Sequence, residues 1–122
     1  MNWFLNQPPD VRSSNQLEIA ASEFECQGLE LDWVGVCWGG DLSIGASSSA
    51  WSFRQFAGTK WQAVATPIDR TYLLNTYRVL LTRAREGAIV WVPRGSASDE
   101  TRSPQLFDAT ADFLRNCGLI EL

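Results

Sequence analysis

Two short apolar runs constrain the fold of this chain more than any other feature of its sequence. Trp33–Trp38 is followed by Gly39-Gly40-Asp41, and Ala88–Val92 is followed by Pro93. A run of this kind is typical of a strand that is buried on both faces of a parallel sheet. Because helical periodicity lies between and after the two runs, we expect an α/β fold with a parallel sheet.

Two segments have that helical periodicity. In residues 69–85 apolar side chains recur every three or four positions, and Gly87 lies just past the end, which predicts an amphipathic helix. A second helix is predicted between Ser103-Pro104 and Gly118, because these residues supply an N-cap, a first-turn proline and a C-terminal glycine. Functional groups are then expected in loops beyond the carboxyl ends of the strands.

The remaining segments give weaker signals. Partial alternation in Leu17–Phe24 predicts a strand, and the serine-rich segment Ser43–Ala50, which contains Ser47-Ser48-Ser49, predicts a loop. Residues 51–56 and 61–65 flank Ala57-Gly58-Thr59-Lys60 and predict a small β-hairpin. We further expect an irregular start over residues 1–16, a candidate terminal strand over residues 119–122, and buried positions for Trp33, Trp38, Trp91 and the three cysteines.

The composition excludes several classes of enzyme site. The chain contains no histidine, which rules out Ser-His-Asp triads, Cys-His pairs and histidine-ligated zinc. Its three cysteines are widely spaced and odd in number, so neither a Cys-x-x-Cys metal site nor a fully paired disulfide framework is expected. The single lysine lies in Gly58-Thr59-Lys60-Trp61, which lacks the pattern of a phosphate-binding P-loop.

Length and charge narrow the class further. The 122 residues suit one domain, and without an export signal or an apolar stretch of membrane-spanning length we expect a cytoplasmic location and no membrane partner. Residues 1–53 carry one basic and seven acidic side chains, whereas residues 69–94 carry five arginines and two acidic side chains. In the predicted helix, Arg83 flanks one side of the apolar stripe and Arg78 and Arg85 flank the other, where a cleft wall would lie.

Two motifs carry a resemblance to a known family. Gln27-Gly28-Leu29-Glu30 and Thr82-Arg83-Ala84 resemble motifs V and VI of superfamily 1 helicases and related RecA-like NTPases. The similarity is closer to the helicase-like domain of Schlafen-type proteins, whose longer versions of these motifs match Gln27–Trp33 and Tyr77–Arg85. Asp99-Glu100-Thr101-Arg102 also matches a downstream Asp-x-Thr-Arg motif of these proteins. One departure is Ser22, which stands where that family usually has threonine. The resemblance covers nearly the whole chain.

The resemblance implies a single domain over residues 1–122 with a partial RecA-like fold, in which a mostly parallel sheet has flanking helices and a small β-hairpin insertion. Such a domain is the C-terminal lobe of a nucleic-acid-dependent ATPase or helicase, and the P-loop lobe is absent from this sequence. By resemblance, Arg83 is the arginine finger that stabilises charge on the γ-phosphate, and Gln27, Gly28 and Glu30 contact the nucleotide. ATP with Mg²⁺ would be bound mainly by the P-loop lobe, so the chain by itself is not expected to hydrolyse ATP.

Other interpretations stay open for the same residues. Arg83 could lie over the core and pair with Glu86 or Asp69. The aromatic side chains of the hairpin could pack in the core and the arginines of the helix could be solvated. Alternatively, the hairpin and the helix could bind single-stranded DNA or RNA through phosphate contacts and base stacking. The candidates for such binding are Arg54, Lys60, Trp61, Arg78 and Arg85. For the whole chain, the alternative function is a stand-alone α/β protein-interaction module without a catalytic role.

Overall fold

A computed structural model of the chain describes residues 2–45 and 50–122. The chain divides into two compact units. Unit 1 contains Met1–Val34 and Thr76–Ala88, and unit 2 contains Gly35–Asn75 and Ile89–Leu122. Half of the loop predicted over Ser43–Ala50, including Ser47-Ser48-Ser49, lies outside the described residues. The loop prediction was wrong for Ser43 and Ile44, which belong to a strand over Leu42–Ile44.

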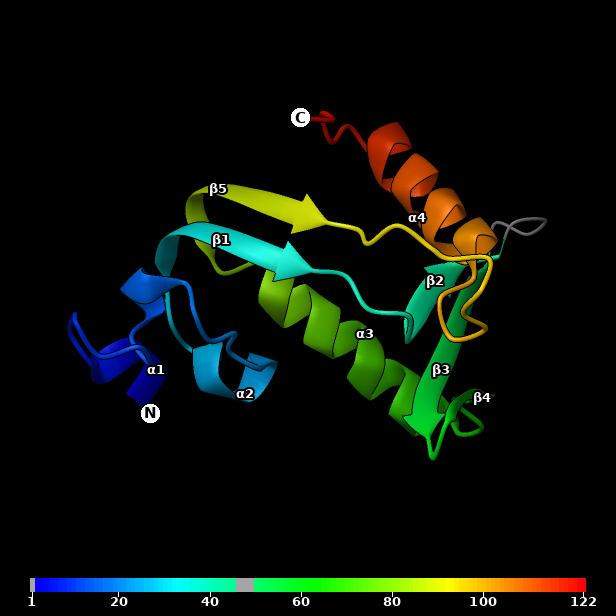
Figure 1. The fold of residues 1–122 in the computed structure, drawn as a ribbon, viewed down its shortest axis with the longest axis horizontal. Coiled ribbons are helices and arrows are strands. Elements are labelled where there is room, and N and C mark those ends of the chain that lie inside the picture. Colours follow the sequence, from blue (N-terminus) through cyan, green and yellow to red (C-terminus); the bar gives the residue numbers. More distant parts are fainter. Residues whose placement is uncertain (1, 46–49) are drawn as a thin grey trace. The chain divides into compact units, whose positions relative to one another are not determined.

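The described chain begins with short helical segments, continues with four consecutive strands, and alternates between helix and strand only from Pro67 onward (Figure 1). In chain order they are α1 (Asn2–Leu5), the 3-10 turn η1 (Ser14–Gln16), α2 (Glu23–Cys26), β1 (Leu31–Cys37), β2 (Leu42–Ile44), β3 (Trp51–Ala57), β4 (Lys60–Ala63), α3 (Pro67–Leu81), β5 (Ala84–Trp91) and α4 (Pro104–Asn116). None of the described helices is long and apolar enough to cross a membrane.

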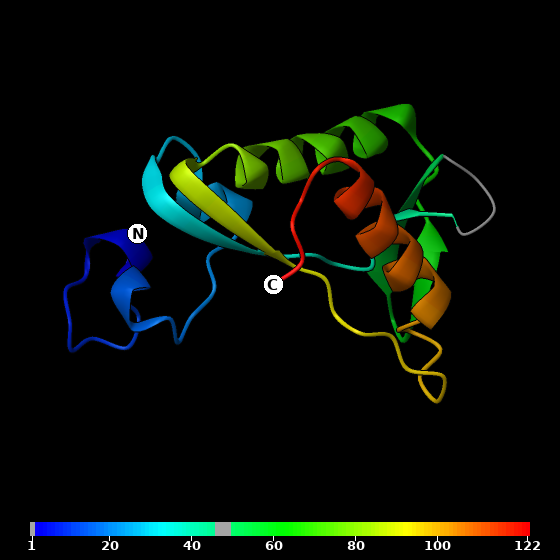
Figure 2. The ribbon, with the colours of Figure 1, turned by 90° about the horizontal axis from the view of Figure 1, so that it is seen from above.

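Strands β1 and β5 form a parallel pair, and Figures 1 and 2 show them side by side and running in the same direction. Leu31 N donates to Arg83 O at 3.0 Å, and Trp38 N donates to Trp91 O at 2.9 Å. The sequence therefore predicted both strands and their parallel pairing correctly. Burial on both faces was wrong for the described chain, because Trp33 and Trp91 are 64% and 60% exposed.

The second sheet is antiparallel and has the order β2-β3-β4. Its β3–β4 part is the predicted hairpin, with Ala57 opposite Lys60 and Gly58 in the left-handed region at φ 64°. A glycine suits that turn because it has no Cβ to clash. The described residues thus form an α/β fold, but the expectation of a mostly parallel sheet was wrong, since the larger sheet is antiparallel.

Helix α3 ends four residues earlier than predicted, at Leu81 instead of Arg85. Residues 84–91 pair with β1 instead, so strand hydrogen bonds override the helix propensity of Ala84 and its neighbours. Gly87, which resembled a helix-terminating glycine, lies in β5 beneath the indole ring of Trp33. A Cβ at Gly87 would approach Trp33 Cζ3 to 2.3 Å.

The predicted strand at Leu17–Phe24 is absent. Leu17 has a left-handed conformation with φ 58°, which breaks an extended segment. Ser22 is then the N-cap of α2. Glu25 Oε2 accepts hydrogen bonds from Ser22 N at 2.9 Å and from the Ser22 hydroxyl at 3.1 Å. The candidate terminal strand over residues 119–122 is also absent.

The core of unit 2 lies where α4 packs on β2 (Figure 2). Trp38 is buried and stacks on Trp51 with a centroid distance of 6.2 Å, and Trp51 meets Phe113 edge-on at 5.1 Å. Helix α4 begins at Pro104, as predicted, and Gly118 follows it with φ 100°. The predicted N-cap bond of Ser103 is absent.

The cysteines do not share one environment. The sequence predicted that all three would be buried, and this is correct for Cys26 but wrong for Cys37 and Cys117, which are exposed. All three are free thiols. Burial raises the pKa of Cys26, whose thiol contacts Glu23 O at 3.6 Å.

Candidate functional site

The turn between α2 and β1, residues Gln27–Glu30, has an open backbone. Gly28 adopts a left-handed conformation with φ 82°, and no atom lies within 4 Å of the position that a Cβ would occupy. The side chains of Gln27 and Glu30 are exposed, and Leu29 N donates to Cys26 O at 3.1 Å. A ligand could therefore approach this main chain closely.

Arg83 lies two residues after α3 and binds three oxygen atoms. Its Nε donates to Val79 O at 3.0 Å, its Nη1 to Leu29 O at 3.2 Å, and its Nη2 to Thr82 Oγ1 at 3.2 Å. Val79 O lies in the last turn of α3 and also accepts from Thr82 N at 3.3 Å, so the guanidinium of Arg83 adds a second donor to this carbonyl and acts as a side-chain cap of the helix. A guanidinium has five N–H groups, and two of those on Arg83 have no recorded partner among the described residues.

Arg83 also joins the Gln27–Glu30 turn to the end of α3 through its main chain, since its carbonyl accepts from Leu31 N at 3.0 Å. The sequence predicted that Arg83 and the turn would belong to one site, and the structure brings them together in unit 1. The alternative pairing of Arg83 with Glu86 or Asp69 is not formed. Instead, Trp33 Nε1 donates to Glu86 Oε2 at 3.2 Å, and Thr66 Oγ1 donates to Asp69 Oδ2 at 2.7 Å.

The two other arginines of the predicted helix occupy different elements. Arg78 is exposed on α3, and its carbonyl accepts the Thr82 hydroxyl at 2.7 Å. Arg85 lies on β5, where its Nε donates to Asp32 Oδ1 at 3.0 Å and its Nη2 binds the same oxygen. The hydrogen bonds and charge of Asp32 raise the pKa of Arg85. Both members of this ion pair are more than half exposed.

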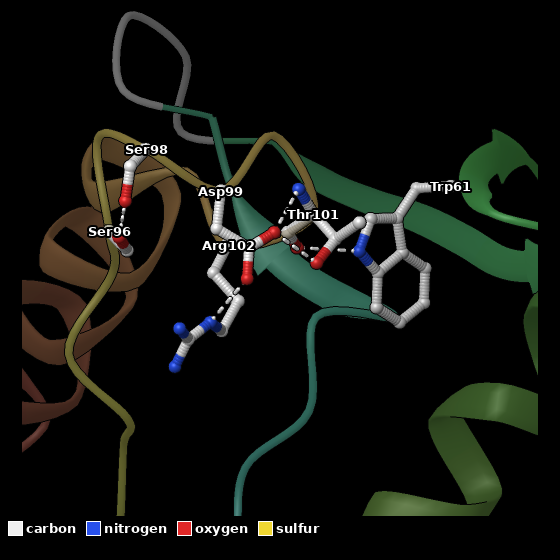
Figure 3. A network of polar contacts seen from close by, with 6 residues as sticks. All are labelled: Trp61, Ser96, Ser98, Asp99, Thr101 and Arg102. Carbon is white, nitrogen blue, oxygen red and sulfur yellow. Dashed lines mark hydrogen bonds and ion pairs between the residues drawn. The ribbon is translucent and has the colours of Figure 1, made fainter.

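The hairpin side chains are held by contacts within unit 2. Trp61 Nε1 donates to Thr101 O at 2.7 Å (Figure 3). The Arg54 guanidinium lies 5.4 Å from the Trp61 ring centroid, and a Cβ on Gly40 would lie 2.8 Å from Trp61 Cζ2. These contacts compete with the stacking of a base on Trp61. Lys60 is exposed at the turn, opposite Ala57, and Phe56, which is 53% exposed, lies opposite Trp61.

Arg54 is the more buried cation of the hairpin. Its Nη2 lies 3.5 Å from Ser43 Oγ, whereas its buried Nε has no hydrogen-bond partner among the described residues. Burial lowers the pKa of Arg54, and the charge of Asp41 opposes this shift. Arginine side chains remain protonated in proteins, so Arg54 still presents a cation at the hairpin.

The segment Asp99-Glu100-Thr101-Arg102, which resembles a Schlafen-type motif, forms a hydrogen-bonded turn. Asp99 Oδ1 accepts from Thr101 N at 2.9 Å and from Thr101 Oγ1 at 2.6 Å, and Asp99 Oδ2 accepts from Arg102 Nε at 2.8 Å (Figure 3). These bonds lower the pKa of Asp99 to about 2. The motif closes a compact turn, in which Ser96 N donates to Arg102 O at 2.8 Å.

The site has one residue that sequence reasoning did not single out. Thr82 Oγ1 accepts a hydrogen bond from the Arg83 guanidinium and donates one to Arg78 O. Its place directly before Arg83 in the Thr82-Arg83-Ala84 motif was the available signal. Within residues 2–45 and 50–122, no group of three His, Cys, Asp or Glu side chains is arranged to hold a metal ion.

Comparison with known proteins supplies the family of the chain. No curated protein and no solved structure matches it. The family model for the Schlafen group 3, DNA/RNA helicase domain matches residues 1–94, which include the Gln27–Glu30 turn and Arg83. Because this match spans well over half of the 122 residues, the chain belongs to the Schlafen group 3 family of DNA/RNA helicase domains.

Proposed function

We propose that this chain acts as the C-terminal, RecA-like lobe of a nucleic-acid-dependent ATPase of the helicase type. Membership of a DNA/RNA helicase family implies the use of a nucleoside triphosphate. The sequence contains no P-loop motif, so the triphosphate would be held by a P-loop lobe outside these 122 residues. The role of this lobe would be to complete the nucleotide site and to couple it to nucleic acid.

Arg83 carries the proposal. In phosphoryl transfer, an arginine supplied from outside the P-loop can stabilise the charge that develops on the γ-phosphate, with an effect of about 10³- to 10⁵-fold in rate. Arg83 is half-buried and fixed by three hydrogen bonds, yet it retains two N–H groups without a recorded partner in the described chain. A fixed guanidinium with spare donors suits this task, because little reorganisation is needed when the phosphate arrives.

The Gln27–Glu30 turn fits the edge of a nucleotide site. Gly28 leaves open space beside its backbone. The exposed amide of Gln27 can donate to a phosphate oxygen, and the exposed carboxylate of Glu30 can accept from a ribose hydroxyl. When bound, ATP supplies the γ-phosphoryl group that is transferred to water. We assign the Mg²⁺ of ATP to the P-loop lobe, since the described residues of this chain offer it no cluster of carboxylates.

The nucleic-acid contacts of this lobe stay predictions for five side chains. The exposed cation Lys60 can reach a phosphate without losing an ion pair that the structure records, and Arg78 is a further candidate on the exposed side of α3. Arg85 would have to leave Asp32, and Trp61 and Arg54 already contact each other. We therefore expect Lys60→Ala to weaken single-strand binding more than Arg85→Ala does, with a steep dependence on salt.

Reconstitution of the ATPase tests the proposed function. The chain is mixed with the P-loop lobe of a Schlafen group 3 helicase domain, and ATP hydrolysis is measured with and without single-stranded DNA or RNA. We expect stimulation by the wild type and its loss in Arg83→Ala, while Arg94→Ala, a change at an exposed arginine, retains it. Stimulation that is indifferent to Arg83, or none despite proven binding of the two lobes, would contradict the proposal.

Exposed apolar side chains favour the stand-alone interaction module as a second candidate function. In unit 1 alone, Leu17 and Phe24 are 90% and 78% exposed, and exposed apolar surface marks sites of protein association. Such a module would bind a partner protein equally well with Arg83→Ala and would lose binding with Phe24→Ser. The P-loop lobe assay separates the two candidates, because only the first requires Arg83.

A further inference from the structure

The hydroxyl of Thr82 connects the end of α3 to the guanidinium of Arg83. Thr82 Oγ1 donates to Arg78 O at 2.7 Å and accepts from Arg83 Nη2 at 3.2 Å. A hydroxyl can do both at once, because it has one hydrogen and two lone pairs. The donation to Arg78 O turns the hydroxyl hydrogen toward the helix, which leaves a lone pair for Arg83.

Thr82 differs from the other two acceptors of Arg83. Val79 O and Leu29 O are main-chain carbonyls, which every residue type at those positions would provide. Thr82 Oγ1 is the side-chain acceptor of this guanidinium in the described chain. The orientation of Arg83 is therefore sensitive to the identity of residue 82, because the third bond needs a side-chain acceptor at that position, which the Thr82 hydroxyl supplies.

We propose that Thr82 is a positioning residue that sets the orientation of the Arg83 guanidinium. This inference rests on the proposed function, in which Arg83 acts on the γ-phosphate. Two carbonyl bonds, to Nε and Nη1, leave the guanidinium able to rotate and tilt about the line joining them, and the bond from Nη2 to Thr82 limits that motion. Small errors in the placement of a catalytic group are costly, since a displacement of about 1 Å can lower a rate about 100-fold.

Two substitutions at residue 82 separate positioning from packing. Thr82→Val keeps the branched shape but loses the hydroxyl, whereas Thr82→Ser keeps the hydroxyl and loses only an exposed methyl group. In the reconstituted ATPase, we expect Thr82→Val to lower kcat by about 10- to 100-fold with little change in KM for ATP. We expect Thr82→Ser to stay within about threefold of the wild type on the same basis.

A double-mutant cycle then tests whether Thr82 acts through Arg83. In the Arg83→Ala background, Thr82→Val should cause no further loss of kcat, because the group that it positions is gone. Circular dichroism and binding to the P-loop lobe are measured for every variant, so that unfolding is distinguished from a loss of positioning. A separate readout is the ¹⁵N signal of Arg83 Nε, which should broaden or shift in Thr82→Val and stay in place in Thr82→Ser.

The outcomes are distinguishable. If Arg83→Ala lowers activity but Thr82→Val does not, or if Thr82→Val has the same effect with and without Arg83, the positioning role is overturned and the proposed function stands. If Arg83→Ala leaves the stimulated activity unchanged, both fall. Loss in Thr82→Val, rescue in Thr82→Ser and no further loss in the double variant together support the inference.

Discussion

The Arg83 guanidinium donates to the carbonyl oxygen of Leu29 at 3.2 Å, across a separation of 54 residues in the chain. The main chain adds a second link, because Leu31 N donates to Arg83 O at 3.0 Å. The side chain and the backbone of one residue thus hold the Gln27–Glu30 turn next to the end of α3. A change at Arg83 should therefore affect the structure of the turn as well as any chemistry at the guanidinium.

The first prediction concerns the stability that Arg83 provides. Arg83→Ala removes the bonds to Val79 O, Leu29 O and Thr82 Oγ1. Because the side chain is only half-buried, water replaces part of what is lost, and we expect the free energy of unfolding to fall by about 1–2 kcal/mol. Urea unfolding followed by circular dichroism measures the change.

Two control variants accompany this measurement. Arg83→Lys keeps the positive charge but cannot bridge three acceptors in the fixed geometry of a guanidinium, so it should lose most of the same stability. Arg94→Ala, at an exposed arginine, should have a negligible effect. If Arg83→Ala proves as stable as Arg94→Ala, the three hydrogen bonds make no net contribution.

The sequence was sufficient to predict the elements whose signals are local. The apolar runs became β1 and β5, the Ala57–Lys60 segment became the hairpin turn, and Pro104 and Gly118 mark the two ends of α4. In each case, short-range chemistry and the final structure agree. One failure comes from contacts between distant segments, because pairing with β1 ends α3 at Leu81 and draws Arg85 into a strand. The missing strand at Leu17–Phe24 is a local failure, since Leu17 is left-handed and Ser22 bonds to Glu25.

The candidate site shows the same division. The resemblance to helicase motifs implied that Gln27–Glu30 and Arg83 share a site, and their hydrogen bonds show that the two segments meet. The sequence could not show that Arg83 caps a helix, since this requires knowing where α3 ends. It also could not show that Trp61 is held by Thr101 O, 40 residues away, because no local pattern encodes that contact.

A second prediction concerns Gly95, which has no room for a side chain. A Cβ at Gly95 would lie 2.3 Å from Pro104 Cα and 2.5 Å from Pro104 N. Because these are main-chain atoms, the clash cannot be relieved by a rotamer change, and Gly95→Ala should cost about 1–3 kcal/mol. Gly35→Ala is the matched control, since no atom lies within 4 Å of its Cβ position. For Gly95→Ala, the midpoint temperature of thermal unfolding should be well below that of Gly35→Ala. Equal midpoints for the two variants would refute the close approach of Gly95 to Pro104.

A third prediction concerns the pH dependence of the turn around Asp99. Hydrogen bonds from Thr101 and Arg102 lower the pKa of Asp99 from 3.8 to about 2. A carboxyl group whose pKa is lower in the folded state stabilises it above the unfolded pKa, and this contribution is lost as the pH falls through the folded pKa. The turn should therefore lose order between about pH 4 and pH 2.

Carbon-13 NMR of the Asp99 carboxyl group measures that titration directly. Thr101→Val removes the hydroxyl that donates to Asp99 Oδ1, so the pKa should move up toward its ordinary value. Ser98→Ala is the control, because its hydroxyl contacts Ser96 and not Asp99. The hydrogen-bond explanation fails if Thr101→Val and Ser98→Ala leave the Asp99 pKa at the same value.

The fourth prediction concerns Thr110, a fully buried residue of α4 that accepts a hydrogen bond from the edge strand β2. Thr110 Oγ1 accepts from Ile44 N at 3.2 Å and donates to Leu106 O at 2.8 Å. Thr110→Val keeps the shape but leaves a buried N–H without a partner, which should cost about 1–3 kcal/mol. Thr110→Ser keeps the hydroxyl and removes one buried methyl group, at about 1 kcal/mol.

Because the costs of Thr110→Val and Thr110→Ser overlap, hydrogen exchange at the Ile44 amide is the decisive measurement. Exchange should accelerate in Thr110→Val and remain slow in Thr110→Ser, and equal protection in both variants would mean that β2 does not depend on the hydroxyl.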